Sequence, residues 1–317
     1  MRIEILNIPN YYCSYYILTL YQNSSLKFEK EGQFRKYDHR PLIIFRFAGK
    51  IYVIDNNDPV GFDDYLYSIA TFYFVTNKLI GHKLYQSKKI RPLYPHYPIN
   101  SLNIYLKLFR LNLISCLSIR TLLKLIKTLF VLPHYRFEKS GLNETKFIFF
   151  SSRLWLKETS ANQIRASFIQ YCQNDNRFQF EGGFRRRSDG NNLSFDAFLS
   201  DKTYSPKEFS KLSKRSRIVL NNPAVAGALS WRFAEYLNHG LFVVNFPFSI
   251  DLPSAMIHGK NIFSVSSVEE IPQVLDMIIE SPDRCQEIAK GGKEFFEQYC
   301  TPEKQWRYIM THFPPKT

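Results

Sequence analysis

Residues 221–247 read NNPAVAGALSWRFAEYLNHGLFVVNFP, and this stretch decides the fold. The apolar run at 215–221 predicts a strand, and the small residues that follow it allow backbone amides to approach a ligand. A helix is expected over residues 231–239, ended by Gly240 as a C-cap, and residues 241–246 predict the next strand. Strand, helix and strand in this order favour a βαβ unit and a parallel sheet.

The same alternation extends to both sides of this stretch. Strands are expected at 146–151 and 262–265, and helices at 162–172, 268–280 and 283–300. The fold class predicted for this part is therefore α/β. In parallel sheets, ligands bind beyond the carboxyl ends of the strands, often against helix N-termini.

The first third of the chain predicts short strands separated by turns, at residues 2–8, 42–47 and 51–54. Gly49 indicates a turn between the last two strands. Residues 65–76 favour a buried helix followed by a strand. The three prolines within 91–100 exclude a long helix there.

A length of 317 residues suggests two domains of roughly 150 residues each. The stretch KSGLNET at 139–145 is typical of a linker. We therefore expect a first domain at 1–145, a second at 146–300 and a C-terminal helix within 301–317.

Composition narrows the class further. A hydrophobic fraction of 45% supports sizeable cores and excludes a disordered chain. The five cysteines form no C-x-x-C pair, so neither a disulfide framework nor a cysteine zinc site is expected. No signal peptide and no apolar run long enough to span a bilayer are recognised, which favours the cytoplasm.

A net charge of +14 indicates an anionic partner, which can be nucleic acid, an acidic membrane surface or a phosphorylated substrate. Residues 101–140 carry seven basic side chains and one acidic side chain. Within 101–132, Arg120, Lys124 and Lys127 share one helix face among leucines and isoleucines. The segment is interpreted either as a core helix with a solvated basic stripe or as an in-plane membrane-surface helix, with a nucleic-acid groove as a third alternative.

The residues that open the helix at 231 predict an anion site. Ser230, Trp231 and Arg232 bring free backbone amides, the helix dipole and a guanidinium to one place. One turn later, Glu235 can accept hydrogen bonds from paired hydroxyls such as those of a ribose. Together these features are typical of a nucleoside diphosphate pocket.

The chain resembles the donor-binding half of GT-B glycosyltransferases of the bacterial surface-polysaccharide type. The resemblance rests on Ser230-x-Arg232-x-x-Glu235-Tyr236-Leu237-x-x-Gly240-Leu241-Phe242-Val243-Val244, on Leu252-Pro253 and on His258-Gly259-x-Asn261. SSRLW at 151–155 and FEGGFR at 180–185 are similar to strand-end loops of such enzymes. The likeness covers roughly residues 146–310.

The resemblance implies two Rossmann-like domains facing across a cleft, with an acceptor-binding first domain and a C-terminal helix that returns to it. Many retaining members carry Glu-x7-Glu, but Gly227 stands where the first Glu would be. Exostosin-like and family 1-like donor domains therefore both stay open, as does the stereochemical outcome. The implied donor-binding residues are Glu235, Arg232, Ser230, Trp231, Arg153, Gly183, Arg185, Asn222 and His258.

The catalytic base is expected in the first domain. Asp55 and Asp58 follow a predicted strand end, and His96 lies in the proline-rich stretch. Asp63 and Asp64 are rivals. No metal is expected, because the chain has no H-x-x-x-H and no D-x-D, so Arg side chains and helix amides would neutralise the leaving diphosphate.

The resulting hypothesis is a metal-independent hexosyl- or deoxyhexosyltransferase without a cofactor. It would move a sugar from a nucleotide-diphosphate sugar to a hydroxyl of a growing, lipid-linked surface glycan such as lipopolysaccharide, capsule or O-antigen. We expect it in the cytoplasm, peripheral at the inner face of the cell membrane. The alternatives are a basic nucleic-acid-binding protein and a non-catalytic, membrane-associated scaffold of the same fold.

Overall fold

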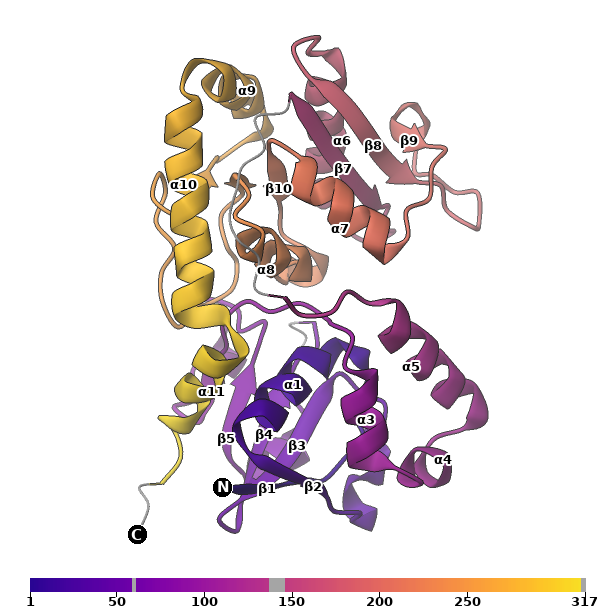
Figure 1. Ribbon diagram of the computed structural model, residues 1–317. Coiled ribbons are helices and arrows are strands. Elements are labelled where there is room, and N and C mark those ends of the chain that lie inside the picture. Colours follow the sequence, from indigo (N-terminus) through magenta and orange to yellow (C-terminus); the bar gives the residue numbers. More distant parts are fainter. Residues whose placement is uncertain (59–60, 137–145, 315–317) are drawn as a thin grey trace. The chain divides into compact units, whose positions relative to one another are not determined.

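The computed structural model describes residues 1–58, 61–136 and 146–314, and the chain divides into two compact units (Figure 1). The first unit comprises Met1–Arg136, Ile250–Ser254 and Gln298–Thr317. The second unit comprises Phe137–Ser249 and Ala255–Glu297. The linker predicted at 139–145 lies outside the described residues.

The first unit is built on a six-stranded sheet with the order β2-β1-β3-β4-β5-β6. Its strands are β1 (Arg2–Ile5), β2 (Ser25–Phe28), β3 (Leu42–Phe47), β4 (Lys50–Asp55), β5 (Ala70–Val75) and β6 (Ile90–Pro92). Neighbouring strands are parallel except at β3, which runs antiparallel to β1 and β4. The three early strands predicted from the sequence are confirmed, but the sheet departs from an all-parallel arrangement at β3.

A two-residue turn joins β3 to β4 and accounts for that departure. Ala48 and Gly49 both have positive φ, at 49° and 73°. Positive φ at both central residues gives a turn whose twist matches that of the strands it joins, and glycine adopts it without steric cost. The turn predicted at Gly49 is therefore confirmed as an antiparallel hairpin.

Helices cover both faces of this sheet. They are α1 (Ser14–Asn23), α2 (Asp64–Ile69), α3 (Leu102–Phe109), α4 (Asn112–Cys116), α5 (Ile119–Val131) and α11 (Pro302–Met310), with short turns η1 (Tyr11–Cys13), η2 (Gly32–Tyr37) and η3 (Lys83–Tyr85). Side chains alternate across a strand. Ile43 and Phe45 accordingly join the core under α1 and α11, whereas Leu42 and Ile44 join the core under η2 and α2.

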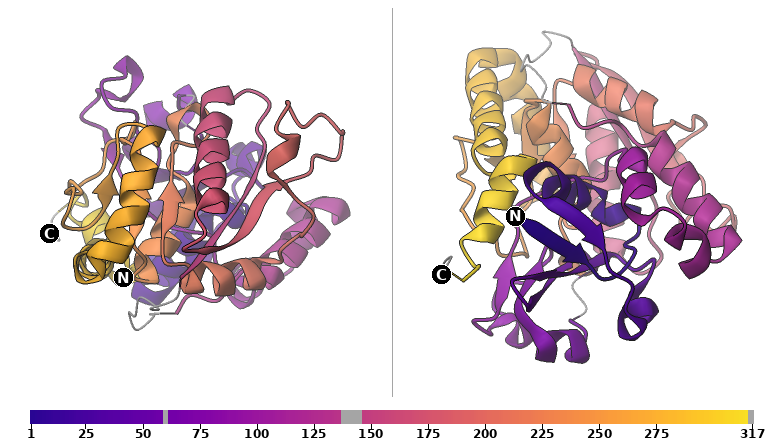
Figure 2. Two further views of the ribbon diagram at one scale, coloured as in Figure 1. Left: turned by 90° about the horizontal axis from the view of Figure 1, so that it is seen from above. Right: turned by 60° about the horizontal axis from the view of Figure 1, so that its bottom comes forward.

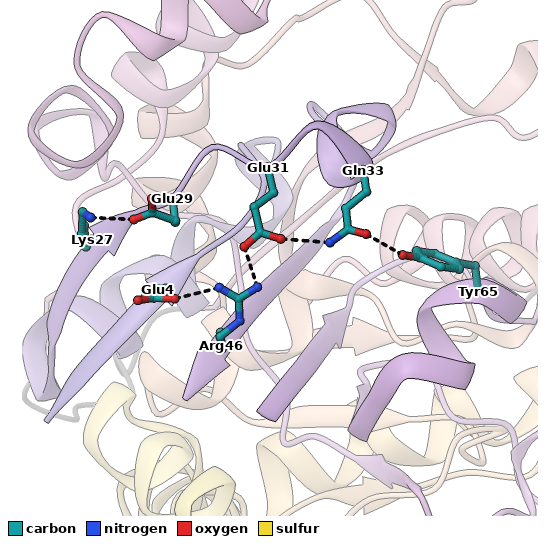
Figure 3. A network of polar contacts seen from close by, with 7 residues as sticks. All are labelled: Glu4, Lys27, Glu29, Glu31, Gln33, Arg46 and Tyr65. Atoms are coloured by element: carbon teal, nitrogen blue, oxygen red, sulfur yellow. Dashed lines mark hydrogen bonds and ion pairs between the residues drawn. The ribbon is translucent and has the colours of Figure 1, made fainter. Parts of the chain in front are cut away.

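A chain of polar contacts holds the segment before η2 against the sheet (Figure 3). Arg46 on β3 pairs with Glu4 on β1 at 2.9 Å and with Glu31 at 2.5 Å. Glu31 also accepts a hydrogen bond from Gln33 at 2.9 Å, and the Tyr65 hydroxyl donates to Gln33 at 3.0 Å. Both ion pairs are partly exposed, so the network fixes geometry more than it adds stability.

The apolar and basic segment 101–132 forms three short helices, α3, α4 and α5. Arg110 ends α3 with φ of 49°, a conformation that interrupts the helix. Ser118 then caps α5, because its hydroxyl accepts a hydrogen bond from the Thr121 amide. The right-hand view of Figure 2 shows the three helices lying together beside the sheet of the first unit.

The second unit contains six strands in two hydrogen-bonded groups of three. They are β7 (Phe147–Arg153), β8 (Gln179–Arg185), β9 (Leu199–Ser200), β10 (Val219–Asn221), β11 (Val243–Asn245) and β12 (Phe263–Ser264). All four pairings within the groups are parallel. The groups meet at β7 and β10, where the Arg217 amide donates to the Phe147 carbonyl at 2.7 Å.

The spatial order of these strands is therefore β9-β8-β7-β10-β11-β12. Counted from β7, this is the 3-2-1-4-5-6 order of a Rossmann-like sheet. The connecting helices are α6 (Thr159–Asn174), α7 (Pro206–Arg215), α8 (Trp231–Asn238), α9 (Ile271–Glu280) and α10 (Pro282–Phe295), with turns η4 (Asp196–Phe198), η5 (Val225–Gly227), η6 (Val268–Glu270) and η7 (Phe296–Cys300). The α/β class predicted for this part of the chain is confirmed.

Helices also cover both faces of the second sheet (Figure 2). Ile148 and Phe150 of β7 pack with α6 and α9 in the larger core. Phe147 and Phe149 point to the opposite face, where they pack against Phe209 of α7. The site described next lies at one end of this three-layer arrangement.

Candidate functional site

The strand order of the second unit reverses between β7 and β10. In open α/β sheets, ligands bind beyond the carboxyl ends of the strands at such a reversal. β7 ends there at Arg153 and β10 ends at Asn221. Asn221 is buried, and its Oδ1 has no hydrogen-bond partner among the described residues, although its amide donates to Asn245 at 2.6 Å.

Arginines end both β7 and β8. Arg153 and Arg185 are paired in the parallel register of the two strands, so their side chains leave the same face of the sheet. Both are exposed. The segment 180–185 was expected to be a strand-end loop, which is wrong, because residues 179–185 form β8 and only Arg185 reaches the end of the strand.

Close packing explains the two glycines of β8. A Cβ at Gly182 would lie 1.9 Å from the Phe150 carbonyl oxygen, and one at Gly183 would lie 2.7 Å from the Phe198 carbonyl oxygen. Both residues also have positive φ, at 130° and 122°. Packing against Phe198 of η4 and against β9 therefore accounts for Gly183, and the structure gives no support to its predicted donor-binding role.

Arg165 on α6 is buried at the switch point and was not among the predicted site residues. Its guanidinium lies 3.6 Å from the centre of the Trp155 ring. Its Nε donates to Asn222 Oδ1 at 3.0 Å, and a terminal nitrogen donates to the Arg153 carbonyl at 3.4 Å. Burial lowers the pKa of Arg165 to about 10, so the side chain is still charged at neutral pH.

The sequence does carry a signal for Arg165. It interrupts an otherwise apolar helical face that includes Ala161, Phe168, Ile169 and Cys172, and a charge there needs a reason. Asn222, predicted to bind the donor, instead holds Arg165 and is itself buried. Its place in the structure is that of a positioning residue.

The loop after β10 is tied back to the loop after β7. The Ala226 amide donates to Glu158 Oε1 at 2.8 Å. Ala226 has φ of 52° and is followed by Gly227 with φ of 82°. This contact fixes the small-residue loop that leads into α8, so its backbone amides are held in place before α8 begins.

Arg232 lies in the first turn of α8 between two aromatic rings. Its guanidinium carbon is 3.1 Å from the centre of the Phe209 ring and 4.7 Å from that of Trp231. Burial lowers the pKa of Arg232, and the Arg153 charge lowers it further. The structure thus brings together Arg153, Trp231 and Arg232, with Ser230 as the N-cap of α8.

Tyr236 lies in the field of both Arg232 and Arg165. Burial raises the pKa of Tyr236 to about 12, although the charges of Arg232 and Arg165 both act to lower it. Among the described residues, no carboxylate lies within 4.0 Å of Arg153, Arg165 or Arg232. The switch point therefore gathers three arginines without a carboxylate of the described residues within 4.0 Å, although the charge of Glu235 acts on Arg232 and that of Glu158 acts on Arg165.

Glu235 is buried, at 3% exposure, one turn beyond Arg232. Its carboxylate lies 3.5 Å from His239 Nε2 and accepts a hydrogen bond from Ser210. Burial would raise the pKa of Glu235, but the contacts with His239, Arg232 and Ser210 bring it below its ordinary value. The carboxylate is thus ionised and held by protein groups, with His239 as the partner that the sequence did not predict.

The side-chain contacts of His258 are with residues of β12. Its Nδ1 accepts a hydrogen bond from the Ser264 amide at 3.1 Å, and its ring lies 4.8 Å from that of Phe263. These contacts shape the loop that precedes β12. The predicted donor-binding role of His258 has no support in this geometry.

Two of the three predicted catalytic bases in the first unit are held by their own surroundings. Asp55 accepts hydrogen bonds from the Tyr73 hydroxyl at 2.6 Å and from the amide and side chain of Asn57 at 2.9 and 2.6 Å, while burial raises its pKa. Burial lowers the pKa of His96 to about 3, and its Nδ1 lies 3.2 Å from the Tyr16 hydroxyl. Asp58 follows β4 and is exposed.

Two further observations concern metals and membranes. Within residues 1–58, 61–136 and 146–314, no group of three or more His, Cys, Asp and Glu side chains is placed to hold a metal ion. In the same residues, no helix combines the length and apolar character needed to cross a bilayer.

No protein-family profile matches the chain, and no curated protein matches its sequence. Several solved structures of glycosyltransferases are similar to it. The C-terminal domain of a group 1 family glycosyltransferase (LpcC) from Francisella tularensis is 15% identical, with a TM-score of 0.36 over 49% of this chain and 85% of that one. A glycosyltransferase from Rickettsia africae ESF-5 is 10% identical, with a TM-score of 0.49 over 81% of this chain and 69% of that one.

Anabaena HepE, solved in complex with UDP-glucose, is 13% identical, with a TM-score of 0.46 over 82% of this chain and 72% of that one. These three TM-scores lie below 0.5, so the similarities do not by themselves assign a fold family. The Rossmann-like order of the second unit stands on its own strand pairing.

Proposed function

We propose that the protein is a glycosyltransferase of the GT-B type whose second unit binds a nucleotide-diphosphate sugar and whose first unit binds the acceptor. One observation carries this proposal. Arg153, Arg165 and Arg232 gather at the switch point of a Rossmann-like sheet, and no carboxylate of the described residues lies within 4.0 Å of them. Arginines beside the N-terminal turn of a helix suit a diphosphate.

The arginines divide into two roles in this proposal. Arg153, Arg185 and Arg232 contact the diphosphate oxygens together with the amides that open α8. Arg165 is fixed by Trp155 and Asn222 and acts as a positioning residue for the loop ends.

Glycosyl transfer needs charge stabilisation at the leaving group. The acceptor oxygen forms a bond to the anomeric carbon while the bond from that carbon to the diphosphate oxygen breaks, and the diphosphate leaves with the electron pair. Fixed arginines stabilise the negative charge that develops on it, and losing one such donor typically costs about 10²–10³-fold in rate. We propose that this replaces a metal ion in the reaction.

The acceptor hydroxyl must give its proton to a base. A base must be reachable by the acceptor hydroxyl and is most effective when its pKa lies near the working pH. His96, with a pKa of about 3, and the buried Asp55 fit this role poorly. Asp58, exposed after β4, is the base that we propose if the reaction inverts.

Glu235 is proposed to accept the ribose hydroxyls of the donor. Its ionised state supports that role, and Ser210 and His239 hold it in place. Binding of inorganic pyrophosphate, which carries the two phosphates but no ribose, distinguishes the role of the arginines from that of Glu235. Glu235→Ala should weaken nucleoside diphosphate binding and leave pyrophosphate binding unchanged, whereas Arg232→Ala should weaken both.

For the acceptor, we propose the hydroxyl of a lipid-linked surface glycan, such as lipopolysaccharide, capsule or O-antigen, reached at the inner face of the cell membrane. The transferred sugar would be a hexose or a deoxyhexose. The net charge of +14 and the basic, apolar helices α3 to α5 support an anionic membrane as the partner.

A thermal-shift screen of UDP, GDP, CDP and dTDP tests the proposal. A ligand at 100 times its Kd stabilises the folded state by about 2.7 kcal/mol. One of the four should therefore raise the Tm by roughly 5–10 °C, and the shift should grow with concentration. If none of them shifts the Tm at millimolar concentration, the proposed donor site is wrong.

A further inference from the structure

The helix α5 divides its surface into three stripes. Leu122, Leu125 and Leu129 face the core of the first unit. A second stripe consists of apolar side chains at i, i+4, i+7 and i+11, which stack along one helix face. It is formed by Ile119, Leu123, Ile126 and Phe130, of which Ile119, Leu123 and Phe130 are 76%, 62% and 65% exposed.

The third stripe is basic and lies next to the exposed apolar one. At 100° per residue, Arg120, Lys124 and Lys127 lie within a narrow sector beside the line from Ile119 to Phe130. All three basic side chains are exposed. A core helix with a solvated basic stripe needs no exposed apolar stripe, so that interpretation leaves Ile119, Leu123 and Phe130 unexplained.

The neighbouring helix α4 and the residue before it also expose apolar side chains. Leu111 and Ile114 are 78% and 66% exposed. Lys30 donates to the Ser115 hydroxyl at 3.4 Å, and Arg35 donates to the Ser115 carbonyl at 3.1 Å. Two cations from the segment around η2 therefore lie beside α4, and that segment is held to the sheet by the network of Figure 3.

The charge of this surface selects its partner. Residues 101–136 contain six Lys or Arg and no Asp or Glu. Large exposed aliphatic side chains have no counterpart on a phosphodiester backbone, whereas acyl chains and anionic headgroups match an apolar stripe flanked by cations. A second copy of the chain would bring the same positive charge to the contact and repel it.

We propose that α4 and α5 form a docking surface for an anionic lipid bilayer. Leu111, Ile114, Ile119, Leu123 and Phe130 enter the boundary between headgroups and acyl chains, and Arg120, Lys124 and Lys127 contact the lipid phosphates. α5 lies in the plane of the membrane. The choice of partner rests on the proposed function, since the lipid-linked acceptor is in that membrane.

Flotation of the full chain with vesicles tests this surface. We expect binding to phosphatidylcholine vesicles that contain phosphatidylglycerol and little binding to phosphatidylcholine alone. Each cation near such a surface strengthens binding several-fold. The triple variant Arg120→Gln, Lys124→Gln, Lys127→Gln should therefore bind about 100-fold more weakly, and raising the salt from about 0.1 M to 1 M should have a similar effect on the wild type.

The apolar stripe is tested separately. Ile119→Ser with Leu123→Ser removes two side chains from the acyl region and should weaken binding by at least about 100-fold. Both positions are exposed, so folding should be unchanged, which circular dichroism checks. Ile80→Ser with Leu84→Ser is the matched control, because these side chains are 63% and 48% exposed in the same unit outside α4 and α5.

Lys50→Gln, Lys83→Gln and Lys88→Gln form the control for charge, since these exposed lysines belong to the first unit but not to α4 or α5. Equal binding of the α5 variants and both controls would overturn the proposal. The proposal would also be overturned if the chain failed to bind vesicles and instead self-associated or bound RNA, and the Ile119→Ser, Leu123→Ser variant abolished that association. Nucleoside diphosphate shifts measured on the same variants should be unchanged, so failure of this surface is distinct from failure of the donor site.

Discussion

The carboxyl ends of the strands differ between the two units in how their charges are satisfied. In the first unit, Asp55 accepts three hydrogen bonds, and Asp63 accepts one from the Tyr37 hydroxyl at 2.8 Å and one from the Leu66 amide at 2.9 Å. In the second unit, Arg153 and Arg232 lie close enough to repel each other. Charges whose hydrogen bonds the protein supplies are structural, whereas arginines gathered without a carboxylate of the described residues within 4.0 Å call for an external partner.

The largest expected effect comes from a substitution that forces β7 and β8 apart. Gly182→Ala places a Cβ 1.9 Å from the Phe150 carbonyl oxygen at φ of 130°, so the strands that carry Arg153 and Arg185 must move apart. We expect a loss of about 3 kcal/mol or more in the free energy of unfolding, measured in urea. Gly190→Ala is the control, because nothing lies within 4 Å of its Cβ, and it should cost about 1–2 kcal/mol. Equal losses would contradict the close packing described for β8.

Asp55→Asn tests the carboxylate of the first unit whose hydrogen bonds the protein supplies. The variant loses part of a three-bond network and should unfold with about 1–3 kcal/mol less free energy. Burial raises the folded pKa of Asp55, so the wild type binds this proton more tightly when folded and loses stability as pH rises from about 4 through that raised pKa. The variant should lack this slope in pH-dependent unfolding. Normal stability with a rate reduced by more than about 100-fold would instead identify Asp55 as the base.

Glu235→Gln tests a charged group of the second unit that is held by other protein groups, as Asp55 is in the first unit. The folded pKa of Glu235 is lowered, so its contribution to stability is present above the unfolded value of about 4.3 and is lost as pH falls through the folded value. The variant should lose roughly 1 kcal/mol at neutral pH and lack that acid-side loss. Thermal unfolding between mildly acidic and neutral pH measures both effects. An unchanged acid-side profile would show that His239 and Ser210 do not hold the ionised carboxylate.

Local patterns were sufficient to predict much of the second unit. Alternating apolar runs gave β7, β10, β11 and β12, but not β8 and β9, and Gly240 with φ of 65° ends α8 as its position indicated. The N-terminal turn of α8 placed Arg232 at the end of the sheet because parallel strands end at a common edge. These features depend on residues within one βαβ unit.

Contacts between distant residues were not predictable in this way. Arg165 meets Asn222 across 57 positions, and nothing local to either residue indicates the pair. The family resemblance suggested a strand-end loop at 180–185, but the glycines at 182 and 183 are required by the close approach of other backbone segments to β8. Arg110 breaks α3 without a glycine or proline to mark the place.

Titration calorimetry with the nucleoside diphosphate that gives the largest thermal shift tests the central claim most directly. Arg232 and Arg177 are both arginines of the second unit, but Arg177 pairs with Asp175 and Asp276 at 2.7 Å near the opposite end of β8. The account predicts that Arg232→Ala weakens binding by roughly 10–100-fold, the value of one charge-assisted hydrogen bond, and that Arg177→Ala leaves it unchanged. Equal affinity of both variants, or no heat with any nucleoside diphosphate, would contradict it.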